Sequence, residues 1–526
     1  MKKTKKIILI DLGVLASVIV AVVSVAYIYT SFQKPVVINE KLVFRNKLNI
    51  PPLLHPRMEN GEKVFDLSAQ EGETEFFPVK KTKTMGFNGS YLGPTIRAST
   101  GDKIRMNVTN NLGDSTTVHW HGMNLPAAMD GNAHQFLKPK ENWQPYWTIA
   151  NEAASLWYHP HLMGKTGEQV YRGLAGFFII DDQNSDSLDL PRDYSVDDIP
   201  LAIQDKQFDA NAQLVYKHEP TDVLGHTPML GDTILVNGTY APYVDVPAKH
   251  VRLRVLNASN ARRYNFGFDD SRIFYQIATD GGLLESPVAR TRMILAPGER
   301  AEIVVDLTNE TKPFTLISDA IHEENSLQRF VWTVLQADRD RDVNQTFKIL
   351  ELRPQSTNIK SNPLPPKLNT IEELKTSGTI KTRQFVLDSD QTINGRKIDH
   401  QRIDEIVHAG DTEIWEISNR SGVYHPFHIH AVQFLILDRS GKPPGDYERG
   451  WKDTVLVSEE TVRVIIRFPT YANSHVPYMF HCHILEHEDM GMMGQFVVVD
   501  KDTSNEDITI KTKFNESGDH ETMSDH

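Results

Sequence analysis

The amino-acid sequence predicts an all-β protein made of three β-sandwich domains, preceded by a hydrophobic N-terminal segment. Short runs rich in valine, isoleucine, threonine and phenylalanine alternate with turns that contain glycine, proline, asparagine and aspartate, and long helical periodicity is scarce. The length of 526 residues exceeds what one ordinary hydrophobic core holds and is typical of about three domains. An internal repeat relates the first and last of these domains, which supports the same division.

The first element of the chain is an N-terminal segment, residues 1–31, that predicts export from the cytoplasm. Residues 2–6 contain four lysines, and residues 7–29 are almost wholly apolar, with Asp11 as their one charge. Such a run is long enough to span a bilayer, and its basic side stays in the cytoplasm. Two interpretations stay open: a cleaved signal peptide with a secreted protein, or a membrane anchor formed by residues 7–29. In both, the protein is extracytoplasmic and faces outward.

Matching segments define the three domains that follow. A strand-like run at 100–105 leads to a pair of histidines, and a run at 409–414 leads to another pair in the same way. The middle part contains similar runs without histidine pairs, so we expect it to be a spacer without metal ligands. The expected ranges are 43–183 for the first domain, 195–350 for the second, 379–500 for the third and 501–526 for a polar, disordered tail.

Charge excludes one class of partner. The formal net charge is −13, whereas a protein that binds nucleic acid needs a basic face for the phosphates. We therefore expect no nucleic acid partner. The chain has one cysteine, which cannot form a disulfide within the chain.

The segment around this cysteine carries the strongest chemical signal. Alternate side chains of a strand face opposite sides, so His481 and His483 would share one face while Cys482 points to the other. Cys482, His487 and Met492 lie within eleven residues of sequence. A thiolate, two imidazoles and a weak axial thioether are the ligands of a blue-copper electron-transfer centre. The second imidazole has to come from elsewhere in the chain.

Four His-x-His pairs are the second signal. One such pair is usually two ordinary strand histidines, but four pairs in apolar or aromatic settings, one of them enclosing the only cysteine, indicate metal binding. The position that matches Cys482 in the first domain is Pro160, which cannot bind copper. We therefore expect the cysteinyl site in the third domain only, and a second site where the pairs of both domains meet. The pairs are His119 and His121, His159 and His161, His428 and His430, and His481 and His483.

These motifs resemble those of three-domain multicopper oxidases, the laccase-like group that includes bacterial copper-efflux oxidases and the spore-coat laccase. The resemblance extends from about residue 43 to residue 500 and implies three cupredoxin-like Greek-key β-sandwiches that bind four copper ions. It implies a type 1 copper on His425, Cys482, His487 and axial Met492. It implies a type 2 copper on His119 and His428, and a binuclear type 3 pair on His121, His159, His161, His430, His481 and His483.

The resemblance also implies that two carboxylates, Glu488 and Asp130, relay protons to the trinuclear site. Glu488 directly follows the type 1 ligand His487, and Asp130 lies at the expected distance from His121. The alternative for Asp130 is a plain turn residue before Gly131.

The implied activity is an oxidoreductase that couples four one-electron oxidations at type 1 copper to the reduction of dioxygen to two waters at a trinuclear cluster. Its partners would be dioxygen and a small reductant: a phenol, an aromatic amine or Cu(I). Copper-efflux oxidases typically carry a methionine-rich insertion, whereas no methionine occurs here between Met293 and Met479. We therefore expect a laccase-like enzyme whose type 1 histidines expose their edges to phenols or aromatic amines. A cuprous oxidase in copper tolerance and a non-enzymatic cupredoxin scaffold are the alternatives.

Overall fold

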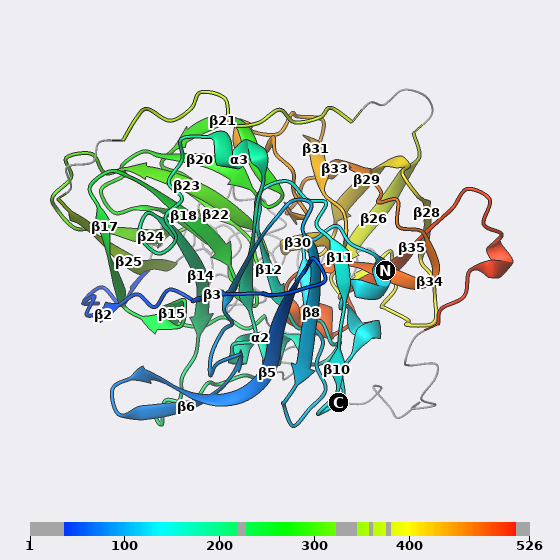
Figure 1. The fold of residues 1–526 in the computed structure, drawn as a ribbon, viewed down its shortest axis with the longest axis horizontal. Coiled ribbons are helices and arrows are strands. Elements are labelled where there is room, and N and C mark those ends of the chain that lie inside the picture. The colour runs from blue at the N-terminus through cyan, green and yellow to red at the C-terminus, as the bar shows by residue number, and fades with distance from the viewer. Residues whose placement is uncertain (1–35, 218–227, 322–344, 357–360, 375–379, 512–526) are drawn as a thin grey trace, which may run out of the picture.

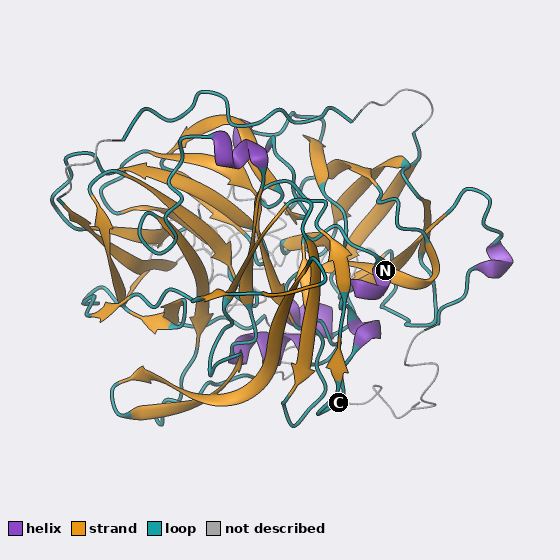
Figure 2. Ribbon diagram, in the orientation of Figure 1, coloured by secondary structure: helices purple, strands orange, loops and turns teal. Residues whose placement is uncertain are grey.

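The structure is a computed structural model that describes residues 36–217, 228–321, 345–356, 361–374 and 380–511. These residues fold into three β-sandwiches (Figure 1), joined by loops and a few short helices (Figure 2). The predicted all-β class is confirmed. The predicted N-terminal segment, residues 1–31, lies outside the described residues. In the part of the chain that the structure describes, every helix is too short or too polar to cross a membrane.

The first sandwich packs a six-stranded sheet against a five-stranded sheet. In strand β8, Ile104, Met106 and Val108 are buried and the residues between them are more exposed, which is the period of two that a half-buried strand requires. Both sheets contribute to one core, for example with Phe65 and Phe178. The six-stranded sheet contains β4 (Arg57–Glu59), β5 (Glu62–Phe77), β6 (Lys80–Phe87), β8 (Lys103–Asn110), β10 (Asn142–Trp143) and β11 (Tyr146–Thr148). The five-stranded sheet contains β3 (Leu53–Leu54), β7 (Thr95–Ser99), β9 (His119–His121), β12 (Ala154–His159) and β13 (Gly176–Asp181).

The middle sandwich packs two seven-stranded sheets around a core that includes Leu253, Phe266 and Ile303. One sheet contains β14 (Asp198–Lys206), β15 (Thr233–Val236), β16 (Thr239–Tyr240), β18 (His250–Asn257), β20 (Phe274–Thr279), β21 (Gly282–Arg290) and β23 (Arg300–Asp306). The other contains β1 (Val36–Ile38), β2 (Asn46–Lys47), β17 (Pro242–Pro247), β19 (Tyr264–Phe268), β22 (Arg292–Leu295), β24 (Phe314–Asp319) and β25 (Gln345–Gln355).

Three strands of the middle sandwich lie wholly or partly outside its expected range, 195–350: β1, β2 and β25. Strand β2 falls within 43–183, the range expected for the first domain, but pairs with β17 of the middle sandwich. This pairing covers an edge of β17 whose backbone groups would otherwise lack partners. Strand β25 continues to Gln355, beyond the expected limit of residue 350, because its last five residues pair with β17.

The third sandwich packs two five-stranded sheets around a core that includes Trp415, Phe427 and Phe480. One sheet contains β26 (Thr382–Asp388), β27 (Thr392–Ile393), β29 (Thr412–Asn419), β31 (Phe434–Arg439) and β33 (Val462–Arg467). The other contains β28 (Glu405–His408), β30 (His425–Ile429), β32 (Thr454–Val457), β34 (Asn473–Cys482) and β35 (Met493–Val499).

The predicted repeat is confirmed by the strand pairing. In the first sandwich β12 pairs with β9 and β13, and in the third β34 pairs in the same way with β30 and β35. Strands β13 and β35 each pair in parallel with one further strand, β7 and β28. The histidine pairs thus sit on equivalent strands of the two sandwiches. In Figure 1 the first sandwich is blue to cyan, the middle one green, and the third yellow to orange.

Two short helices connect the first and third sandwiches beside these strands. Asp489 of α5 (Leu485–Asp489) accepts hydrogen bonds from the backbone N–H groups of Thr166 and Gly167 in α2 (Thr166–Arg172) at 3.0 and 2.8 Å. A carboxylate is stabilised at a helix N-terminus, where backbone N–H groups lack partners. The other helices of the described residues are α3 (Gln183–Ser187) and the 3-10 helices η1 (Ala127–Met129), η2 (Ala133–Gln135), η4 (Asp446–Glu448) and η5 (Asn505–Asp507).

The C-terminal tail differs from its prediction over residues 501–511. The N–H of Thr509 donates to the carbonyl of Ser474 at 3.2 Å, and the N–H of Lys511 donates to the carbonyl of His475 at 3.0 Å. Pairing between β34 and β35 is irregular over 473–478, which leaves backbone groups that the tail satisfies. The predicted disorder is therefore wrong for 501–511, and residues 512–526 lie outside the described residues.

Candidate metal centres

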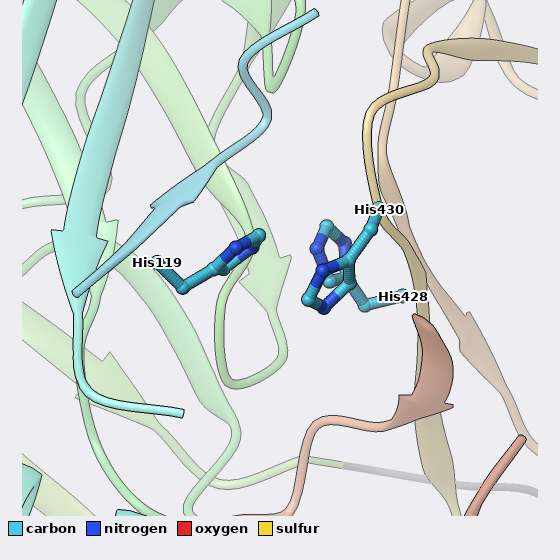
Figure 3. Close-up of side chains that lie close together, drawn as sticks. All are labelled: His119, His428 and His430. Atoms are coloured by element: carbon cyan, nitrogen blue, oxygen red, sulfur yellow. The ribbon is translucent and has the colours of Figure 1, made fainter. Parts of the chain in front are cut away.

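Histidine pairs of the first and third sandwiches meet at the interface between them. Strand β9 contains one whole pair. In each of the other three pairs the first histidine lies in a strand, β12, β30 or β34, and the second lies just past the end of that strand. Figure 3 shows three of these side chains: His119 reaches from the first sandwich toward His428 and His430 of the third. The rings of His119 and His430 stack at a centroid distance of 3.9 Å. All eight members of the predicted pairs are buried: His119, His121, His159, His161, His428, His430, His481 and His483.

The cysteine belongs to a different cluster from the two histidines beside it in sequence. Its Sγ lies 3.2 Å from Nδ1 of His425 and 3.6 Å from Nδ1 of His487. Burial raises the pKa of the Cys482 thiol, so a thiolate at this position requires a bound cation to displace the proton. A metal ion that prefers thiolate and imidazole ligands fits these three donors.

Met492 is brought to the same region by the loop after α5. Its side chain is fully buried in the hydrophobic cluster that also contains Cys482. The N–H of Met492 donates to the carbonyl of His487 at 2.9 Å, and the N–H of Cys482 donates to the carbonyl of Met492 at 3.1 Å. These backbone bonds hold the ends of the loop against β34.

The edges of the two imidazoles near Cys482 are not exposed, so that prediction is wrong. His425 is 1% and His487 4% exposed. Nε2 of His425 lies 2.7 Å from Oγ of Ser421. With Nδ1 facing the sulfur, Nε2 carries the ring proton and donates it to this hydroxyl. Neighbouring residues therefore cover both rings almost completely.

Ring nitrogens that face one another mark a position where a cation fits. The Nε2 atoms of His161, His430 and His481 lie 3.1 to 3.2 Å apart. Nδ1 of His430 donates to Oδ2 of Asp130 at 2.8 Å, and Nδ1 of His481 donates to the carbonyl of Cys482 at 3.0 Å. In a neutral imidazole the other nitrogen is then a bare lone pair. Two lone pairs therefore face each other, and a metal ion between them removes the repulsion.

A second contact of this kind lies within the first sandwich. Nδ1 of His121 is 3.3 Å from Nε2 of His159. Nε2 of His121 donates to Oδ1 of Asp453 at 3.0 Å, and Nδ1 of His159 donates to the carbonyl of Pro160 at 2.7 Å. The facing nitrogens again carry lone pairs, as metal ligands would.

Three more histidines present buried nitrogens to the same interface. Nδ1 of His119 donates to the carbonyl of Asp130 at 3.0 Å, and Nδ1 of His428 donates to the carbonyl of Asp453 at 2.8 Å. Nε2 of both rings, and both nitrogens of His483, have no hydrogen-bond partner among the described residues. Buried polar atoms are normally paired, and a metal ion is the partner that imidazole nitrogens fit.

Burial favours the neutral form of seven imidazoles of this cluster. It lowers the pKa of each of these seven rings, and neighbouring imidazoles lower the pKa further. Burial lowers the pKa of His483 to about 3. A neutral imidazole is the form that binds metal, so these rings need no deprotonation before they bind. The rings whose pKa falls well below its ordinary value are His121, His159, His161, His428, His430 and His481.

Glu488, predicted as a proton relay, is buried beside the cluster. Its Oε1 lies 3.5 Å from Nδ1 of His161, and its Oε2 lies 3.3 Å from Nδ1 of His481. Neither carboxylate oxygen has a hydrogen-bond partner among the described residues. Burial, together with the charge of Asp489, raises the pKa of Glu488 well above its usual range.

Asp130, the second predicted relay, is also fully buried. It follows η1 and precedes Gly131, whose φ is +77°, so it is a turn residue as the alternative held. Its Oδ2 nevertheless accepts from Nδ1 of His430 at 2.8 Å. The turn therefore aims the carboxylate at the cluster, and the two interpretations do not exclude each other.

Asp453 and Arg300 belong to the site but were not predicted from the sequence. Asp453 contacts His121 and His428 as described above, and Arg300 of the middle sandwich donates to both of its carboxylate oxygens. The sequence offered little signal for either residue. Asp453 precedes β32 without a histidine or cysteine nearby, and Arg300 lies in the domain expected to be a spacer.

Similarities to known proteins extend over most of the chain. Two family descriptions, both named Multicopper oxidase, match residues 68–185 and 362–502. Multicopper oxidase mco from Staphylococcus aureus is 36% identical over 460 residues, which cover 86% of this chain and 93% of that protein. Cell division protein FtsP from Escherichia coli is 35% identical over 452 residues, which cover 86% of this chain and 92% of that protein. A laccase from Pediococcus acidilactici, 36% identical, superposes with a TM-score of 0.77 over 89% of this chain and 95% of that one.

Proposed function

Because the chain belongs to the multicopper oxidase family, we propose that it couples four one-electron oxidations of a small aromatic reductant to the reduction of dioxygen to two waters. The fold is that of three cupredoxin-like sandwiches, and the protein is an oxidoreductase that uses copper, dioxygen and a reductant. Beyond family membership, we propose two further properties. The reductants are phenols or aromatic amines, as for a laccase, and the protein binds four copper ions in three kinds of site.

The observation that carries this proposal is the arrangement of donors at the end of β34. Cys482 lies with His425 and His487 in one group of possible metal donors. The residue before it, His481, lies with His161 and His430 in another. One strand therefore supplies ligands to two sites of different chemistry, a thiolate site and an imidazole site.

The assignment of ligands follows the family pattern. We assign type 1 copper to His425, Cys482 and His487, with Met492 as the axial ligand. We assign type 2 copper to His119 and His428, whose Nε2 atoms are bare. We assign the type 3 pair to the six remaining histidines: His121, His159, His161, His430, His481 and His483.

Bound copper supplies one-electron chemistry, taking electrons singly from the reductant and delivering four of them to dioxygen. The protein supplies the path between the sites. Cys482 and His481 are covalent neighbours, and Nδ1 of His481 donates to the carbonyl of Cys482 at 3.0 Å. An electron can thus pass from the thiolate to the imidazole cluster within one dipeptide. The burial of the histidines separates the cluster from bulk solvent.

Protons for the two waters need carriers, because the imidazoles are neutral and those that bind metal release none. We propose that Glu488 and Asp130 hold these protons. The position of Glu488 between His161 and His481 supports its role, as does the contact of Asp130 with His430. A carboxyl group within reach of the site is suited to proton transfer.

The variant Glu488→Gln is expected to keep its copper and its blue colour but to reduce dioxygen about 100-fold more slowly, the size typical of losing a proton donor. The amide has the shape of the acid but no proton to release. Stopped-flow reoxidation of the fully reduced enzyme by dioxygen measures this step separately from oxidation of the reductant.

The matched control for this variant is Glu486→Gln on the same helix. The carboxylate of Glu486 accepts from Nδ2 of Asn260 at 2.8 Å instead of facing the histidine cluster. Its reoxidation rate should stay near that of the wild type. An unchanged rate in Glu488→Gln would remove Glu488 from the proton path.

The proposed choice of reductant predicts a higher kcat/KM for a phenol or an aromatic amine than for Cu(I). The sequence lacks methionine between Met293 and Met479, and thioethers are the soft ligands that bind Cu(I). Steady-state oxygen consumption by the copper-loaded protein, with each reductant in turn, measures the ratio. A higher kcat/KM for Cu(I) would instead make the protein a cuprous oxidase of copper tolerance.

We also propose an extracytoplasmic location, secreted or held on the outer face of the cytoplasmic membrane. The four lysines of residues 2–6 and the apolar run 7–29 support it.

A further inference from the structure

A buried ion pair links the middle sandwich to the histidine cluster. Arg300 begins β23, and its guanidinium donates from Nη1 to Oδ1 and from Nη2 to Oδ2 of Asp453 at 2.7 and 2.6 Å. Such a bidentate pair fixes the orientation of the carboxylate. The guanidinium also donates to the carbonyl oxygens of Ser155, Gly298 and Asp280 at 3.0 to 3.1 Å. Since Ser155 belongs to the first sandwich and Asp453 to the third, the arginine joins all three.

Asp453 in turn orients two imidazoles. Its Oδ1 accepts from Nε2 of His121 at 3.0 Å, and its main-chain carbonyl accepts from Nδ1 of His428 at 2.8 Å. A neutral imidazole has one ring proton, so these bonds leave Nδ1 of His121 and Nε2 of His428 as bare nitrogens. Groups that bond the far nitrogen of a metal-binding histidine set its tautomer and its direction.

Two glycines bring this network close to the cluster. A Cβ on Gly122, the residue after His121, would lie 2.5 Å from Oδ2 of Asp453 and 2.8 Å from Nη2 of Arg300. A Cβ on Gly298 would lie 2.9 Å from Cδ2 of His483. Any larger residue at either position would displace the ion pair or the ring. The chain at Gly122 therefore approaches the ion pair, and the chain at Gly298 approaches the ring of His483, as closely as the backbone allows.

The same geometry argues that Asp453 is not itself a metal ligand. Its carboxylate lies within 4.8 Å of donor atoms of His121 and His428, so distance alone would permit ligation. Both oxygens, however, are bound by Arg300, and Oδ1 also accepts from the hydroxyl of Thr454 at 3.0 Å. The positive guanidinium of Arg300 already neutralises the negative carboxylate that a metal ion would need as a ligand. The remaining role of Asp453 is to position the imidazoles.

We propose that Arg300 is a positioning residue for the copper cluster: from the middle sandwich it holds Asp453 in the orientation that makes His121 and His428 present bare nitrogens to copper. The inference rests on the proposed function, because it concerns the copper ligands assigned there. The middle sandwich, which was expected to act only as a spacer, would then also contribute a residue that orients the copper ligands.

The variant Arg300→Met tests this role in the full-length, copper-loaded protein. We expect the histidine cluster to lose about 10- to 100-fold in copper affinity, measured as copper retained against a chelator. The electron paramagnetic resonance signal of type 2 copper and the near-ultraviolet absorption of the type 3 pair should change. The blue absorption at Cys482 should not change. Asp453→Asn should produce the same changes, and Arg300→Lys, which restores the charge, should recover part of the affinity.

Arg254→Met is the matched control. Arg254 is also a buried arginine of the middle sandwich, and it donates to both oxygens of Asp198 at 2.6 and 2.9 Å. Its other hydrogen bonds go to Ser155 and Glu302, not to a residue that touches the histidines. We expect it to lower the midpoint of thermal unfolding as Arg300→Met does, with wild-type signals and copper retention.

The outcomes separate this inference from the proposed function. If the wild type binds copper only at the thiolate or consumes no dioxygen, the proposed function fails and the inference with it. If the wild type has the complete cluster and Arg300→Met keeps its signals and retention, the inference alone is wrong. Equal changes in Arg254→Met, or unfolding of both Arg300→Met and Asp453→Asn, would assign the ion pair to folding and overturn the inference as well.

Discussion

Replacement of Cys482 with serine is expected to abolish the blue absorption and to lower the oxidation of a phenol by about a thousandfold or more, the size typical of removing one member of a catalytic unit. A serine hydroxyl has nearly the shape of the thiol but does not provide the soft thiolate ligand that type 1 copper requires. It therefore removes both the site that receives electrons and the start of the path along β34. Visible absorption, copper content and oxygen consumption measure the three consequences.

The histidine cluster should keep its copper in this variant, because none of its proposed ligands changes. Copper content should therefore fall by one ion per chain, and the type 2 resonance signal should remain. Met492→Leu is the control, since it removes only a weak axial ligand and should retain the blue colour. Persistent blue colour in Cys482→Ser would contradict the assignment of the thiolate.

Removal of all copper is the second large effect. The metal-free protein should have no oxidase activity and should unfold at a lower temperature, since bare ring nitrogens then face one another inside a buried cluster. A ligand present at 1,000 times its dissociation constant stabilises the folded state by about 4 kcal/mol. Scanning calorimetry and oxygen consumption measure the two losses.

Reloading with Cu²⁺ should restore both properties, whereas Zn²⁺ should restore stability without activity, because zinc binds thiolate and imidazole but carries no electrons. Activity in the metal-free protein, or its recovery with Zn²⁺, would contradict a copper oxidase.

Local sequence pattern was sufficient to predict the strands that position the site. Because alternate side chains of a strand face opposite sides, His481 and His483 were expected to lie apart from Cys482, and they do. The pairing of strands β2, β17 and β25 could not be predicted in this way, because it depends on which edge of a sheet is free. The assignment of Asn46–Lys47 to the middle sandwich depends on such a tertiary contact, and no local pattern contains it.

The residues that touch the candidate metals could be predicted because their chemistry is rare and their spacing regular. The residues that orient them could not. Asp453 is 332 positions from His121, and Arg300 is 153 positions from Asp453. Arginine and aspartate are common surface residues, so only the fold distinguishes this pair from solvated charges. Burial of the imidazole edge of His425 by Ser421 is likewise a property of packing, not of sequence.

The number of electrons that the copper-loaded protein accepts tests most directly whether one strand connects a thiolate site to a separate oxygen-reducing cluster. Anaerobic titration with a reductant, followed by a pulse of dioxygen, measures this number and the fate of the electrons. We predict four electrons per chain, loss of the blue colour during the titration, and its return with one dioxygen consumed and no peroxide released. Uptake of a single electron per chain, or release of peroxide, would contradict it.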